Sequence, residues 1–442
     1  MKNYQAKFGG IMKVSLAVNL DPSELVDMPF MPQAPRHLDE IDIPRTLLED
    51  LILRHAFTKA VTNLRSLSKA LKLPLSILMD LFKQMRQRQF FEIVGMEGND
   101  YNFTLSDQGR AYAEKRFYVC QYAGPAPVSV KSYFSAVRKQ NARLSIDRDY
   151  LRKSFKDLVL TDRLLDQLGP ALISQKSIFL YGPTGSGKTS IASNFDRIFE
   201  DTVFIPYALE YDGQIIVLYD PLVHQKVDFE DIVFDSRWVP CRRPCLITGG
   251  ELEPKMLDLQ IEETTHVYSA PLQLRANNGI LVIDDFGRQS IPPEYLLNRW
   301  IVPLDRRVDY LSLMYGAKFE IPFEMVVVFS TNLDPISLAD EAFLRRIQNK
   351  IFVEPVDPKT FTEIFDRIVT KNQLEADLDS SQFLIELCKN SGPCELRACY
   401  PGDIIDIVTS IATYEGGQVI VDRENLRKAV ELYFTKPNLP GQ

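Results

Sequence analysis

The sequence predicts an α/β protein with a parallel β-sheet, a helical domain after it and a smaller domain of helices and a hairpin before it. Three observations lead to this prediction. From Ser177 onward, short apolar strands alternate with helical segments, which is typical of a parallel sheet covered by helices. After about residue 357 the pattern is mainly helical. Between residues 41 and 120, three segments with helical periodicity precede two strand-like segments.

The composition is that of an ordinary globular protein. Of the 442 residues, 45% are hydrophobic and 25% charged. No run of about 18 apolar residues and no signal peptide is found, so we expect a cytoplasmic chain without a membrane span. The net charge of −8 disfavours strong non-specific binding to nucleic acid or anionic lipid. The six cysteines and four histidines show no metal-binding spacing, which indicates reduced thiols.

Changes in composition and periodicity divide the chain into five segments. A proline-containing stretch without periodicity opens the chain, and a Gly-Pro-Ala-Pro sequence at residues 124–127 follows the first domain. The predicted segments are an extended arm (1–40), the helix-and-hairpin domain (41–120), a linker helix (121–144), the α/β core (145–356) and a helical lid (357–442).

A glycine-rich loop is the most specific motif. A predicted strand, residues 177–181, runs into Gly182-Pro-Thr-Gly-Ser-Gly-Lys188-Thr189, and a helix follows, which is the phosphate-loop pattern in its required context. Backbone N–H groups of such a loop surround phosphates, the lysine bridges the β- and γ-phosphates, and the threonine hydroxyl binds Mg²⁺. The predicted nucleotide contacts are Gly182, Pro183, Thr184, Gly185, Ser186, Gly187, Lys188, Thr189 and Ser190.

A second apolar strand, residues 280–283, ends in the acid pair Asp284 and Asp285. We expect this strand to lie beside the strand that precedes the glycine-rich loop. Asp284 would then share a Mg²⁺ ion with Thr189, and Asp285 would polarise the attacking water. The sequence therefore predicts ATP and Mg²⁺ as cofactors, with Thr189 and Asp284 as the metal ligands.

Together these motifs resemble those of AAA+ ATPases, which are P-loop NTPases, over roughly residues 145–436. That family usually ends the second strand in Asp-Glu, and the shorter Asp285 leaves slow hydrolysis open without implying loss of nucleotide binding. Residues 270–279 resemble the corresponding stretch of MoxR-type ATPases and bacterial enhancer-binding proteins, whose rings carry an insertion in the preceding helix. Residues 203–219 are also expected to form an added hairpin that turns at Asp212-Gly213.

Two further stretches extend the resemblance. Residues 326–332 resemble the sensor strand of AAA+ proteins, and this implies that Asn332 orients the hydrolytic water. Residues 308–313 and 318–322 resemble the hairpin that precedes this strand in the MoxR-like group, where it often lines the central pore of the ring.

The finger and lid assignments rest on looser similarity. Residues 340–347 resemble the arginine-finger helix, which implies that Arg345 or Arg346 reaches the site of a neighbouring subunit in a ring, with a hexamer expected. Gly402 stands where the lid of the family carries an arginine, and Arg397 is the expected substitute.

Residues 41–120 resemble a winged-helix domain. Lys83, Arg86 and Arg88 lie on or just after its third helix, where a DNA-binding protein would contact phosphates. The predicted hairpin tip, residues 97–100, is acidic, and the domain is only weakly basic. Docking of a protein is therefore favoured over DNA binding.

Three functions stay open at this stage. The favoured one is a ring-forming AAA+ ATPase that remodels a protein partner. The first alternative is a DNA-associated ATPase, such as an initiator, loader or transcription regulator. The second is a nucleotide-gated adaptor with little turnover, to which Asp285 and Gly402 point. The identity of the partner cannot be predicted.

Overall fold

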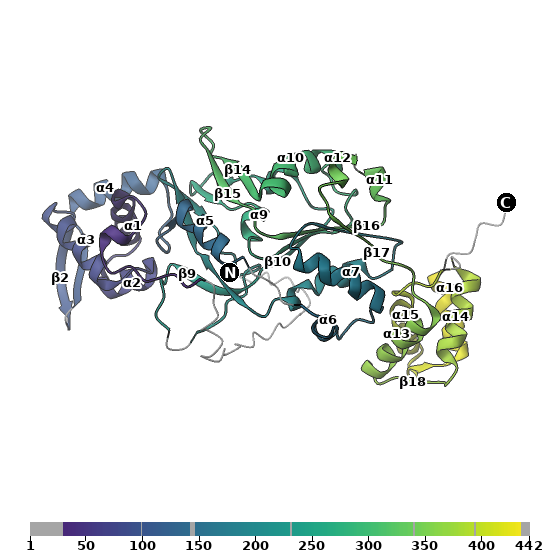
Figure 1. Ribbon diagram of the computed structural model, residues 1–442. Coiled ribbons are helices and arrows are strands. Elements are labelled where there is room, and N and C mark those ends of the chain that lie inside the picture. Colours follow the sequence, from purple (N-terminus) through teal and green to yellow (C-terminus); the bar gives the residue numbers. More distant parts are fainter. Residues whose placement is uncertain are drawn as a thin grey trace, which may run out of the picture.

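The computed structural model describes residues 30–98, 100–141, 146–229, 232–338, 341–392 and 395–434. Figure 1 shows an N-terminal helical domain at one end, the C-terminal helices at the other and two sheets between them. Most of the predicted arm, residues 1–29, lies outside the described residues. None of the described helices is long and apolar enough to cross a membrane.

A five-stranded parallel sheet forms the centre of the molecule, and its strands are connected through helices (Figure 1). The order is β10-β13-β16-β5-β17. The strands are β5 (Ile178–Tyr181), β10 (Cys245–Thr248), β13 (Ile280–Ile283), β16 (Val326–Thr331) and β17 (Asn349–Phe352).

The prediction that β13 lies next to β5 is wrong, because β16 lies between them. Val328 of β16 pairs with Val282 of β13 on one side and with Ile178 of β5 on the other. All six residues of β16 are buried. The longest strand of the sheet thus occupies the middle position, where it is covered on both faces and both edges.

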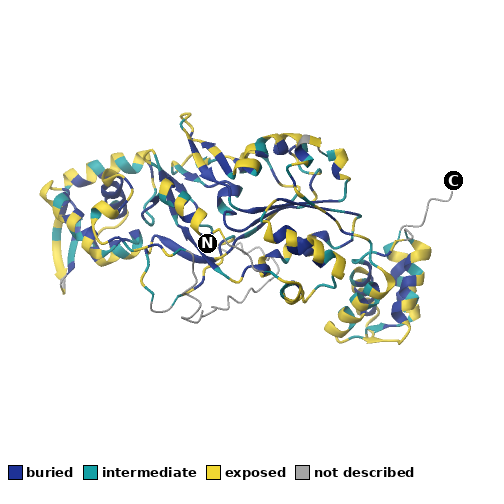
Figure 2. Ribbon diagram, viewed as in Figure 1, coloured by how far each residue is buried: buried dark blue, intermediate teal, exposed yellow. Residues whose placement is uncertain are grey.

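Alternate residues of these strands enter two separate cores. Figure 2 shows the central strands coloured mainly as buried. Ile178 and Leu180 pack with α6 (Arg148–Ser154), α7 (Asp162–Ile173) and α8 (Lys188–Ser193). On the opposite face, Phe179 packs with α10 (Pro293–Arg306) and lies 5.8 Å from Phe329 between ring centroids. This two-sided burial explains the uninterrupted apolar strands in the sequence.

A second, mixed sheet has the order β11-β12-β8-β7-β4. Its strands are β4 (Val128–Ser129), β7 (Ala208–Tyr211), β8 (Gln214–Val217), β11 (Gln260–Glu262) and β12 (Val267–Ser269). The β7–β8 hairpin turns at Asp212-Gly213 as predicted, with both residues at positive φ. The β11–β12 hairpin lies between η4 (Pro254–Leu257) and α9 (Leu272–Arg275), ahead of β13, where an insertion was expected.

The predicted hairpin of residues 203–219 is shorter than expected. Residues 208–217 form it, whereas β6 (Thr202–Pro206) pairs antiparallel with β9 (Trp238–Arg242). All five residues of β6 are buried, and the strand pairs with β9 instead of extending the hairpin.

The segment expected to be a linker is built into the second sheet. Strand β4 pairs with β7, and α5 (Val130–Lys139) follows directly. One stripe of α5, with Tyr133 and Val137, is buried in the core of the second sheet. An amphipathic helix gains stability by burying such a stripe, and the neighbouring sheet provides the apolar surface.

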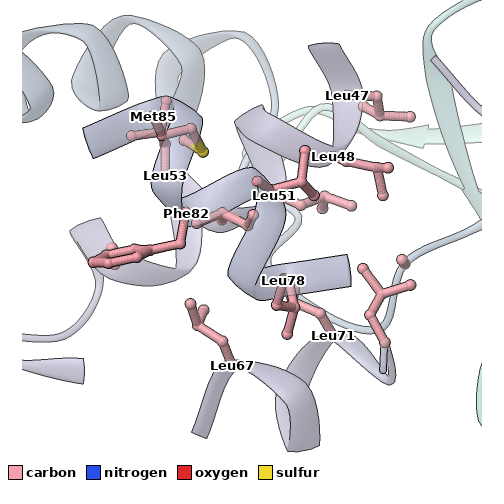
Figure 3. Packing of buried hydrophobic residues seen from close by; sticks show 14 of the residues in the cluster. Leu47, Leu48, Leu51, Leu53, Leu67, Leu71, Leu78, Phe82 and Met85 are labelled. Atoms are coloured by element: carbon pink, nitrogen blue, oxygen red, sulfur yellow. The ribbon is translucent and has the colours of Figure 1, made fainter. Parts of the chain in front are cut away.

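The N-terminal domain has three helices, a hairpin and a fourth helix. Its elements are α1 (Arg45–Phe57), β1 (Thr62–Asn63), α2 (Leu64–Leu71), α3 (Leu75–Gln87), β2 (Phe91–Glu97), β3 (Asp100–Leu105) and α4 (Asp107–Val119). Leu51, Leu67 and Phe82 come from different helices and converge in one core (Figure 3). Ala208 and Ile215 of the second sheet join this core, so the domain is docked on that sheet.

The remaining elements are the C-terminal helical domain, called the lid after its prediction from the sequence, and a hairpin whose buried residues join the core of the second sheet. Helices α13 (Pro358–Lys371), α14 (Ser380–Ser391), α15 (Tyr400–Glu415) and α16 (Arg423–Tyr433), with the short strands β18 (Glu375–Ala376) and β19 (Ile420–Val421), share a core of their own. The predicted hairpin before β16 is formed by β14 (Val308–Ser312) and β15 (Lys318–Pro322). Short helices α11 (Pro335–Leu338) and α12 (Glu341–Leu344) follow β16.

Candidate functional site

The glycine-rich loop lies where β5 ends and α8 begins. At Gly182 the backbone has a φ of 148°, and a Cβ atom there would lie 2.4 Å from the carbonyl oxygen of Val353. Only glycine permits this approach. Residues 184–190 line the adjoining cavity. Gly182 and Pro183, the two other predicted contacts, instead accept hydrogen bonds from Lys188.

Lys188 lies buried at the centre of the loop. Its Nζ atom donates to the carbonyl oxygens of Gly182 at 3.0 Å and Pro183 at 2.8 Å. Burial lowers the pKa of Lys188, while the carboxylates of Asp284 and Asp285 act in the opposite direction. The ammonium group is thus held in the loop by weak neutral acceptors that an anion could replace.

Thr189 and Asp284 meet above the sheet although β16 separates their strands. The Thr189 hydroxyl donates to Oδ2 of Asp284 at 2.8 Å. The described residues contain no group of three or more His, Cys, Asp or Glu side chains placed to hold a metal by themselves. One hydroxyl and one carboxylate suit Mg²⁺, which takes few protein ligands and completes its shell with water and phosphate oxygens.

A tight turn after β13 fixes the acid pair. Asp285 has a φ of 49° and donates its backbone N–H to Oδ1 of Asp284 at 3.1 Å. Gln289 donates to the Asp284 carbonyl at 2.8 Å, and the Thr331 hydroxyl donates to the Phe286 carbonyl at 2.6 Å. The turn is therefore tied to the end of β16, and the exposed Asp285 side chain lines the cavity beside Asn332.

A cavity of about 770 Å³ extends from this turn to the lid. One end is polar and brings together Lys188, predicted to bind the nucleotide, with the predicted metal-binding and catalytic residues Thr189, Asp284, Asp285 and Asn332. The other end is apolar, with Leu158, Leu160, Leu164, Val356, Ile364 and Ile368. A cavity with a charged end and an apolar end of this size can take a phosphate chain and a planar base.

Sequence reasoning missed Arg288 and the apolar end. Arg288 is exposed, lines the cavity and lies four positions after Asp284 in the sequence. Its only sequence signal is its position after the acid pair. The apolar end comes from residues 158–164 and from α13, which are far apart in the sequence and individually resemble ordinary helix-core residues.

The lid touches the loop at Gly185. The backbone N–H of Cys399 donates to the Gly185 carbonyl at 3.1 Å, and a Cβ atom on Gly185 would lie 3.4 Å from Cδ of Arg397. Nε of Arg397 is buried without a hydrogen-bond partner among the described residues. Arg397 is thus next to the loop, whereas Gly402 faces Ile368 of α13.

Arg345 and Arg346 lie away from this cavity. They line a separate pocket of about 570 Å³ with Lys176, Ser177 and Asp305. Ser177 precedes β5, so this pocket is at the opposite edge of the sheet from the loop, which follows β5. Arg346 pairs with Asp305 at 2.9 Å, whereas Arg345 is exposed. Within one chain, the structure does not bring these arginines to the phosphate-binding loop.

One family model and several solved structures match parts of this chain. A family model described as a domain of unknown function (DUF8689) matches residues 357–432, which form the lid. No curated protein matches the chain. Similar solved structures include Thermotoga maritima RuvB, titled a Holliday junction branch migration motor, with 14% identity, a TM-score of 0.36, and coverage of 64% of this chain and 73% of that chain. Two variants of that protein have identities of 13% and 16% and TM-scores of 0.38 and 0.37, each covering 63% of this chain and 72% of that chain.

Proposed function

We propose that this chain is a cytoplasmic, Mg²⁺-dependent AAA+ ATPase that assembles into a ring and remodels a protein partner. The proposal rests on one observation, the 2.8 Å contact between Thr189 and Asp284 beside the buried Lys188. A hydroxyl and a carboxylate that meet next to a phosphate-binding loop are what binding of a metal–triphosphate requires.

Each residue has a distinct role in this proposal. The loop amides and Lys188 bind the phosphates, and Arg397 reaches them from the lid. Mg²⁺ would be held by Thr189 and Asp284 and would neutralise charge on the phosphate oxygens. Asp285 and Asn332 orient the attacking water at the polar end of the cavity.

The ring follows from the position of the two arginines. The phosphate site of one chain lies at one edge of the sheet, and Arg345 lies exposed at the other. A head-to-tail arrangement would place Arg345 of one subunit at the phosphates of the next, where a cation stabilises the charge of the transition state.

A protein is favoured as the partner over DNA. In the N-terminal domain, Arg88 pairs with Glu49 at 2.6 Å and Lys83 lies 3.9 Å from Asp80, so two of the three candidate DNA contacts already have a carboxylate. Tyr315, at the tip of the β14–β15 hairpin, is exposed and aromatic, which suits contact with protein.

The test compares Lys188→Ala with Lys153→Ala, a control on the exposed side of α6. Loss of the charged hydrogen bonds from Lys188 removes on the order of 3 kcal/mol, or about 100-fold in affinity, so Mg-ATP binding should vanish at micromolar concentration. Calorimetry gives the binding and phosphate release gives the turnover. If Lys188→Ala binds and hydrolyses ATP like the control, the proposal is wrong.

The same measurements separate the two alternatives. Turnover that disappears in Lys188→Ala excludes a nucleotide-gated adaptor. Many-fold stimulation of the ATPase by saturating DNA, together with a gel shift at low salt, would instead support a DNA-associated ATPase.

A further inference from the structure

A groove of about 960 Å³ runs between α5 and the two neighbouring hairpins, β7–β8 and β14–β15. It shares no lining residue with the nucleotide cavity. None of the residues predicted for nucleotide binding or catalysis takes part in it, so the groove needs an explanation of its own.

The exposed face of α5 forms one wall of the groove. Lys131, Phe134 and Arg138 follow one another at helical spacing and line it, opposite the stripe that α5 buries. The Arg138 guanidinium lies 4.5 Å from the centroid of the Phe134 ring. Lys131 is exposed and forms no ion pair within the described ranges. This wall is therefore basic.

The hairpins form the other wall, which is aromatic and mainly acidic. The rings of Tyr211 and Phe319 stack at 4.3 Å between centroids. Asp212 accepts a hydrogen bond from the Tyr315 hydroxyl at 2.7 Å, and this contact joins the two hairpin tips. Glu320 lies on the same wall.

Between the walls lies Glu210, a buried carboxylate that is only 8% exposed. Oε1 accepts one hydrogen bond, from the Gly213 N–H at 2.9 Å. Burial raises the pKa of Glu210, and Asp42 and Asp212 raise it further. No lysine or arginine of the described chain forms an ion pair with Glu210. An ionised carboxylate buried among like charges is unfavourable unless it is protonated or a cation joins it.

We propose that this groove binds an extended segment of a partner protein through a lysine or arginine side chain that pairs with Glu210. The Tyr211–Phe319 pair offers an aromatic surface to the incoming cation, and arginine suits such surfaces best. Acidic residues beside the anchor would meet Lys131. A nucleic-acid strand fits less well, because its phosphates would meet Asp212 and the buried Glu210, even though four lysine and arginine side chains also line the groove.

This inference rests on the proposed function only in taking the partner to be a protein. Binding in the groove requires no nucleotide, so it can be measured apart from ATP turnover.

The test uses the full-length chain and fluorescein-labelled nonapeptide pools with a fixed centre of arginine, lysine, citrulline or norleucine. Fluorescence anisotropy should show the arginine and lysine pools binding about ten-fold more tightly than the citrulline pool, since a charged hydrogen bond is lost with citrulline. Glu210→Gln, which keeps the side-chain shape, should abolish this preference. Glu114→Gln, on the exposed side of α4 and outside the groove, should retain it.

Three results would overturn the proposal. The first is an unchanged preference in Glu210→Gln, and the second is equal binding of the citrulline and arginine pools. The third is tighter binding of a labelled single-stranded oligonucleotide than of the arginine pool.

Lys188→Ala separates this proposal from the proposed function, because it should bind the arginine pool like the unmodified chain. If the chain prefers the arginine pool but has no ATPase activity, only the proposed ATPase function is rejected. If it has ATPase activity but does not prefer the arginine pool, only the proposed peptide binding in the groove is rejected.

Discussion

The two five-stranded sheets of this protein differ in how they use their residues. The parallel sheet is buried on both faces, and polar side chains follow its strands at β5, β13 and β16. The mixed sheet is assembled from strands of two to four residues. It carries the N-terminal domain on one side and the groove beside α5 on another.

This difference indicates a division of labour. In the proposed function, the residues that hold a phosphate and a metal stand at the ends of buried strands of the parallel sheet, where backbone and core fix them. The surface proposed to meet a partner stands on short hairpins, where insertions are tolerated. Substitutions near the parallel sheet should therefore change chemistry, and substitutions on the mixed sheet should change contacts.

The largest expected effect lies at the far edge of the parallel sheet. Replacing Arg345 and Arg346 by alanine should lower turnover by about 10³–10⁵-fold while nucleotide binding is retained, because a finger acts only on the transition state. Arg345→Ala alone should account for most of the loss, since Arg346 already pairs with Asp305. Steady-state phosphate release measures this.

Mixing provides the control for that prediction. Subunits of Lys188→Ala keep their arginines, so adding them to the double mutant should restore turnover. Full activity of the double mutant by itself would contradict the ring and would remove the functional role assigned to this edge of the sheet.

The next effect concerns the acid pair. Asp285→Asn should reduce turnover by about 10²–10⁴-fold and leave ATP bound, because the amide cannot accept the proton of the attacking water. Asp285→Glu should raise turnover, since one more methylene brings the carboxylate nearer to the water. Asp228→Asn, on an exposed loop near the mixed sheet, is the control. Equal rates for Asp285→Asn and the control would show that Asp285 has no part in catalysis.

A smaller effect is expected in the core of the parallel sheet. Phe329 is fully buried and contacts Phe179 and Phe286, with ring centroids 5.8 and 5.0 Å away. Phe329→Ala should lower the free energy of opening of this sheet by about 3–5 kcal/mol. Hydrogen exchange of amides in β5, β13 and β16 measures it. Unchanged protection in the mixed sheet would show that the two sheets open separately, whereas an equal loss would show one cooperative unit.

The smallest effect belongs to the hairpin tips. Tyr315→Phe removes the hydrogen bond to Asp212 and should cost about 0.5–1.5 kcal/mol, at the lower end because Tyr315 is exposed. Amides near residues 212 and 315 should exchange faster, while ATP turnover stays unchanged. A fall in turnover as large as that of Asp285→Asn would contradict the division between the two sheets.

The parallel sheet was largely predictable, and its strand order was not. Uninterrupted apolar runs identify β5, β13 and β16, and the glycine-rich loop follows from its spacing. The apolar runs of β13 and β16 are alike, so nothing in either one specifies which lies next to β5. Only the pairing of Val328 with both neighbours decides it.

The mixed sheet could not be predicted in full, because its strands are short and pair with distant segments. Strand β4 has two residues, and its Val128 pairs with Leu209 of β7, 81 positions further along the chain. The part of the groove between its two walls, where Glu210 lies, could not be predicted for the same reason. Glu210 resembles any charged hairpin residue until α5 and the second hairpin are placed around it.

The contact between Cys399 and Gly185 has a consequence for nucleotide signalling. Both partners in that hydrogen bond are backbone atoms, so no side-chain replacement in the lid removes it directly. Any rearrangement of the phosphate-binding loop must pull on the start of α15 or break the bond. The lid helices are thereby linked to the glycine-rich loop through backbone atoms, and this linkage can survive extensive divergence of the lid surface.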